Sequence, residues 1–62
     1  MANIELTLAR DHIDSADPEN IIPAGTSAQL LNIIIEDGKV SFLLDFETGM
    51  EWIDLDEVEE RF

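Results

Sequence analysis

The chain has 62 residues, with 15 acidic and 3 basic side chains and a formal net charge of −12. This charge argues against direct binding to nucleic acid, because phosphate groups are bound by Lys and Arg, and an anionic membrane surface would repel the chain. Without cysteine there are no disulfides, and a single histidine argues against a structural zinc site. A hydrophobic content of 45% exceeds that of a disordered acidic tail, so we expect one folded domain over residues 1–62.

The N-terminal third predicts one strand followed by a long loop. Ile4, Leu6 and Leu8 alternate with more polar positions, a period of two that is typical of a half-buried strand. Residues 11–23 hold Asp, Ser and Asn together with two prolines, as loops do. We expect Ile21 and Ile22 to tuck this loop against the core, and Gly25 to supply a positive φ before the next strand.

Two apolar runs, residues 28–35 and 40–46, flank Asp37-Gly38. This arrangement predicts a β-hairpin with a two-residue type I′ turn. The predicted cross-strand pairs are Glu36–Lys39, Ile35–Val40, Ile33–Phe42 and Leu31–Leu44. One face of this hairpin is wholly apolar, as a core face should be, and consists of Leu31, Ile33, Ile35, Val40, Phe42, Leu44 and Phe46.

Residues 47–50 predict a second tight turn, followed by a strand over residues 51–55. With Thr48 and Gly49 as the loop, Leu44 faces Ile53 and Phe42 faces Leu55, which extends the same core face. Residues 56–62 fit one helical turn followed by a short closing strand.

The opposite face of the predicted sheet mixes large apolar side chains with carboxylates. It holds Leu30, Asn32, Ile34, Ser41, Leu43, Asp45, Glu47, Met50, Trp52 and Asp54. Two alternatives follow: the sheet bends into a barrel and the long loop covers this face, or part of it stays exposed as a binding or dimer surface. Trp52 is the favoured anchor, because it is the single tryptophan and lies beside Asp45 and Asp54.

The order of elements resembles that of small SH3-like β-barrels. The resemblance rests on the segment Ile21-Ile22-Pro23-Ala24-Gly25-Thr26, on the Asp-Gly hairpin, and on the closing stretch from Phe46 to Glu59. It implies an all-β, five-stranded barrel with a long first loop and a short helical turn before the last strand. The chain lacks the tyrosines of peptide-binding members and the basic surfaces of nucleic-acid-binding ones, so the resemblance implies the fold alone.

No arrangement of residues predicts catalysis, a metal site or a cofactor. His12 lies in an acidic loop, where we expect a solvated side chain without a nucleophile beside it. The carboxylates of residues 45–47 and 54–57 do not match the spacing of a calcium-binding loop. The chain also has no apolar run of 18 residues and no secretory leader pattern, so we expect a cytoplasmic protein.

The acidic C-terminal stretch suggests the function. Its last 16 residues hold seven carboxylates, which either form a solvated face or imitate the charge of a nucleic-acid backbone, as acidic phage-type inhibitors of similar size and charge do. We therefore predict a non-catalytic module that binds a basic surface of a partner protein, as an inhibitor of nucleic-acid binding would. The candidate binding residues are Leu43, Asp45, Glu47, Met50, Trp52, Asp54, Asp56 and Glu57. The alternative is a structural subunit or homodimer that uses the Leu43/Trp52 face.

Overall fold

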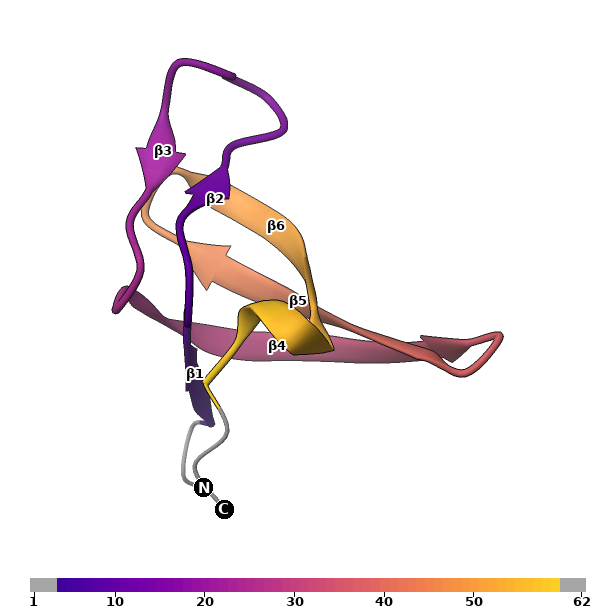
Figure 1. Ribbon diagram of the computed structural model, residues 1–62. Helices are drawn as coiled ribbons and strands as arrows, with labels where there is room; N and C mark the ends of the chain where they lie inside the picture. Colours follow the sequence, from indigo (N-terminus) through magenta and orange to yellow (C-terminus); the bar gives the residue numbers. More distant parts are fainter. Residues whose placement is uncertain (1–3, 60–62) are drawn as a thin grey trace.

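The structure is a computed structural model that describes residues 4–59. Its elements in chain order are β1 (Glu5–Thr7), β2 (His12–Ile13), β3 (Ile21–Ile22), β4 (Ser27–Glu36), β5 (Lys39–Phe46), β6 (Gly49–Asp54) and the 3-10 turn η1 (Leu55–Glu57) (Figure 1). An antiparallel sheet has the order β1-β4-β5-β6, and β2 and β3 form a second, two-stranded sheet. The all-β prediction and the helical turn near the C-terminus are confirmed.

The long first loop contains a short hairpin. His12 pairs with Ile22 and Ile13 with Ile21, and Ile22 is buried while Ile21 is exposed. Of the two isoleucines expected to pack on the core, only Ile22 does so. Gly25 has a φ of +89°, as expected, and its N–H donates to the carbonyl of Leu8 at 2.8 Å.

The Asp37-Gly38 hairpin has the predicted turn and, near its tip, the predicted register. Both turn residues have a positive φ, +50° and +77°, as a type I′ turn requires. The predicted pair Leu31–Leu44 is wrong, because a β-bulge between Leu30 and Asn32 brings Leu30 opposite Leu44. The extra residue reverses which side chains of the first half of β4 face the core, so that Leu30 packs against the core and Leu31 does not.

The turn between β5 and β6 consists of Glu47 and Thr48, and Phe46 pairs with Gly49. The predicted pairs Leu44–Ile53 and Phe42–Leu55 are therefore wrong by two residues: Leu44 faces Glu51, and Phe42 faces Ile53. A shift of two leaves every side chain on its predicted face, because successive side chains in a strand alternate between the two faces.

The core brings together residues of β3, β4, β5 and β6 with one residue after β1 and one after η1. Its buried members are Leu8, Ile22, Ala28, Leu44, Phe46, Ile53 and Val58. Val58 forms a bridge with Leu8, and the N–H of Glu59 donates to the carbonyl of Thr7 at 2.8 Å. The described C-terminal residues therefore lie beside the first strand.

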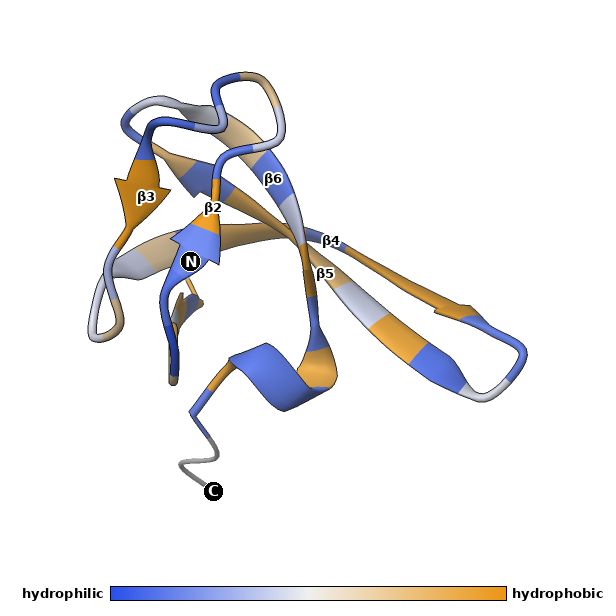
Figure 2. Ribbon diagram, turned by 45° about the horizontal axis from the view of Figure 1, so that its top comes forward, coloured by the Kyte–Doolittle hydropathy of each residue, from blue (hydrophilic) through white to orange (hydrophobic). Residues whose placement is uncertain are grey.

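Three residues of the predicted core face, Leu31, Ile33 and Ile35, are exposed. Their half of the β4–β5 hairpin projects beyond the rest of the fold, and Figure 2 shows hydrophobic residues continuing along it. The reason is length: β1 pairs with β4 only over residues 27–29, and β6 pairs with β5 only over residues 41–46. The prediction that these three residues lie in the core is therefore wrong, because nothing in the described part of the chain covers this half of the hairpin.

Candidate interaction surface

The outer face of β5 and β6 gathers five of the eight candidate binding residues. Cross-strand pairing sets Leu43 opposite Trp52 and Asp45 opposite Met50, and Asp54 lies opposite Ser41. Side chains directly opposite one another in antiparallel strands lie on the same face, so these pairs form three successive rungs. The middle rung is apolar, and a carboxylate stands on each side of it.

This face is open to solvent. Met50 is 61% exposed and Trp52 46%, Asp45 and Asp54 are also exposed, and Leu43 is half-buried. Of the two alternatives drawn from the sequence, the structure therefore has the exposed face. The long loop lies against the other side of β6, where it contacts Glu51, which neighbours Trp52 in the strand and points the opposite way.

The three remaining candidates lie outside this face. Glu47 is in the β5–β6 turn, and Asp56 and Glu57 are in η1. Glu57 is engaged within the chain: its Oε2 accepts the N–H of Asp54 at 3.1 Å, and its Oε1 lies 3.5 Å from His12 Nδ1. The carboxylate of Glu57 therefore caps η1 and holds the first loop.

A cluster around Glu51 was not predicted. Glu51 is buried, its Oε1 accepts the N–H of Ser15 at 2.9 Å, and its Oε2 accepts the Ser15 hydroxyl at 3.0 Å. His12 Nε2 lies 3.3 Å from Oε1, and the His12 side chain is only 16% exposed, so the expected solvated histidine was wrong. The sequence does hold one indication of this cluster. Glu51 stands two positions before Ile53, so it lies on the same face of the strand as that core residue, and a buried carboxylate needs hydrogen-bond partners.

Asp14 shapes the tip of the first loop. Its carboxylate accepts the N–H of Ala16 at 2.9 Å and the side-chain amide of Asn20 at 3.1 Å. These hydrogen bonds stabilise the charged form of Asp14 and lower its pKa below the ordinary value of 3.8, and the bond from Ala16 has the largest effect.

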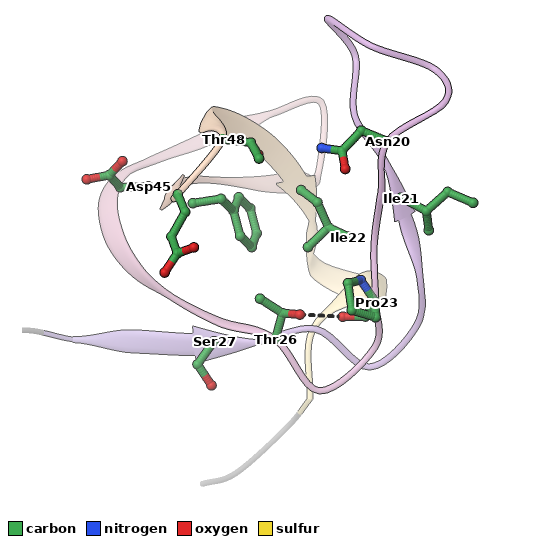
Figure 3. A pocket seen from close by; sticks show the side chains of 10 residues that line it. Asn20, Ile21, Ile22, Pro23, Thr26, Ser27, Asp45 and Thr48 are labelled. Carbon is green, nitrogen blue, oxygen red and sulfur yellow. Dashed lines mark hydrogen bonds between the residues drawn. The ribbon is translucent and has the colours of Figure 1, made fainter.

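A pocket of about 270 Å³ lies between the end of the first loop and the β5–β6 turn. In Figure 3, Ile22 points into it and Ile21 away from it, and the Thr26 hydroxyl donates to the carbonyl of Pro23 at 2.7 Å. Asp45 borders the pocket, but its carboxylate points outward. Among residues 4–59, no group of His, Asp or Glu is arranged to hold a metal ion, and no helix is long and apolar enough to cross a membrane.

The fold and surface define a small antiparallel β domain with an exposed acidic and apolar sheet face. Comparison with known proteins finds no match to this chain among protein families, curated proteins or solved structures.

Proposed function

We propose that this chain is a non-catalytic protein-binding module that docks the outer face of β5 and β6 onto a basic surface of a partner protein. The supporting observation is the register that sets Leu43 against Trp52, with Asp45 and Asp54 on either side, on an exposed face. Aromatic residues and Met are enriched at the centres of protein interfaces, where they supply desolvated contact.

Charge favours a basic partner. The net charge of −12 attracts positively charged surfaces and speeds encounter with them, and carboxylates beside the apolar rung set the orientation of docking. We propose that the partner surface is one that otherwise binds nucleic acid, so that the module acts as an inhibitor by occupying it. The spaced carboxylates of the outer face take the place of backbone phosphates.

The scaffold we propose for this face is an SH3-like barrel. Three features support it: a long first loop, a 3-10 turn after the last long strand, and the return of residues 57–59 to the edge of β1. In such a scaffold β5 is held between β4 and β6, and a rigid docking face limits the entropy lost on binding.

The test is capture of the partner from the source cells, followed by affinity measurements on the purified pair. The double variant Asp45→Asn/Asp54→Asn removes two charges from the face, and Trp52→Ala removes its anchor. The matched control, Glu5→Gln/Glu19→Gln, removes two exposed charges elsewhere.

We expect each face variant to weaken binding at least about tenfold, and the double variant to flatten its salt dependence, because the lost attraction is electrostatic. The control should bind as the parent chain does. Equal loss in the control, or an affinity that does not change with salt, would contradict the proposal.

A further inference from the structure

The projecting half of β4 has an open edge. Beyond Leu30, whose N–H donates to the carbonyl of Ile4 at 2.8 Å, no segment within residues 4–59 pairs with the edge of β4 that faces away from β5. Residues 31–36, which we call the open edge, therefore have a strand on one side only (Figure 1).

The backbone groups of this edge have a defined direction. In a hairpin with a two-residue loop, the flanking pair Glu36–Lys39 is hydrogen-bonded, and bonded and non-bonded pairs alternate from there. The N–H and C=O groups of Ile33 and Ile35 therefore point away from β5. An independent contact agrees, since the N–H of Ile33 is taken by the Asn32 side-chain Oδ1 at 2.9 Å.

The side chains of the open edge are apolar on both faces of the strand. Ile33 is 49% exposed, Ile34 40% and Ile35 70%. A strand that is apolar on both faces is typical of a sheet whose two faces are both buried, whereas these side chains are open to solvent within the described residues. An exposed apolar edge of this kind is a template for pairing with another strand.

The strand that fits this uncharged edge is a second copy of this chain. Two chains of −12 repel each other, but residues 31–35 carry no charge, and the hairpin projects away from the acidic body (Figure 2). At physiological salt, charges more than about 8 Å apart are largely screened. Moreover, an antiparallel edge is self-complementary about a two-fold axis, which closes the assembly at two copies.

We propose that two copies pair through their open edges as antiparallel strands centred on Ile34. In this register Ile33 of one copy exchanges both backbone hydrogen bonds with Ile35 of the other, which are the residues whose groups point outward. Asn32 lies opposite Glu36 of the second copy. Its side chain releases the N–H of Ile33 and donates a hydrogen bond to that Glu36 carboxylate instead. This dimer uses neither Trp52 nor the outer face of β5 and β6, so it is independent of the proposed function.

Sedimentation equilibrium over about a thousand-fold range of chain concentration tests the dimer, since pairing follows mass action. We expect a monomer–dimer equilibrium that strengthens with salt, because screening relieves the repulsion of two acidic chains. Salt should thus strengthen the dimer but weaken binding to a basic partner. Failure of one proposal is therefore distinguishable from failure of the other.

The variant Ile35→Lys places a charge on the open edge. The control Ile13→Lys makes the same change at an isoleucine of β2 that is 60% exposed. We expect the first to be monomeric at every concentration and the second to dimerise like the parent chain. Circular dichroism checks that both variants keep the β structure.

Amide hydrogen exchange on the unaltered chain gives a second readout. The N–H groups of Ile33 and Ile35 should become protected as concentration rises, whereas that of Ile34, already paired with β5, should change little. A monomer at all concentrations and salt levels, or a dimer that Ile35→Lys leaves intact, overturns the proposal.

Discussion

His12 Nε2 lies 3.3 Å from Oε1 of Glu51, and this contact fastens the first loop to β6. The same oxygen accepts the N–H of Ser15, and Glu57 lies 3.5 Å from the other ring nitrogen of His12. A buried carboxylate at the edge of the core thus holds a segment more than 30 residues away in the chain.

Glu51→Ala should lower the free energy of unfolding by about 1–3 kcal/mol, because it leaves the N–H of Ser15 without its acceptor in a part-buried position. Urea unfolding measures the change. Glu47→Ala, in the exposed β5–β6 turn, removes the same charge and should stay within about 0.5 kcal/mol of the parent chain. Equal effects of the two variants would show that the Glu51 contacts add nothing to stability.

Asp14 should make the fold sensitive to acid. Because its pKa is lower in the folded state than in the unfolded chain, the unfolded state binds more protons between the two values, and stability rises with pH in that window. The stabilisation that Asp14 contributes is complete above its ordinary pKa of 3.8. It is lost as pH falls below that value and through the lower pKa of Asp14 in the folded chain.

Thermal melts between about pH 5 and pH 2 test this linkage. Asp14→Asn removes the titrating group, so its midpoint should fall less steeply with acid than that of the parent chain. Asp45→Asn, at an exposed position, is the control and should keep the steep fall. Identical slopes for all three chains would count against the Asp14 assignment.

Trp52→Ala and Ile53→Ala should differ in stability, because Trp52 lies on the surface and the neighbouring Ile53 lies in the core. Ile53 is fully buried, so its truncation should cost about 2–5 kcal/mol, enough to unfold much of a small domain. Trp52 is 46% exposed, and its loss should cost about 1 kcal/mol of stability through the contact with Leu43, while it weakens binding of the proposed partner at least about tenfold. Loss of cooperative unfolding in Trp52→Ala would place this residue in the core instead.

Gly38→Ala should destabilise the hairpin by about 1 kcal/mol, because φ at this position is +77° and this left-handed conformation is unfavourable for an L residue with a Cβ atom. A Cβ there meets no atom within 4 Å, so the cost is conformational and not steric. Asp37→Asn is the matched control, because Asn tolerates the left-handed region and should be nearly neutral. Chemical denaturation compares the two, and an unchanged midpoint for Gly38→Ala would argue against the type I′ turn.

Local features were predictable because they depend on neighbouring residues. Asp37-Gly38 has the turn chemistry that sets the pairs next to it, Glu36–Lys39 and Ile35–Val40. Side-chain alternation along β5 and β6 then placed Leu43 and Trp52 on one face, even though the predicted pairing was off by two residues.

The tertiary structure decided what depends on distant partners. The bulge at Leu31 lets Ala28 and Leu30 face the core while residues 32–36 keep the register of the turn, a compromise between two ends of one strand. Whether Glu51 and His12 were solvated or buried depended on where the first loop crosses β6, and 39 positions of chain separate them. Turn chemistry and alternation are written in the sequence itself, whereas burial is a property of the assembled fold.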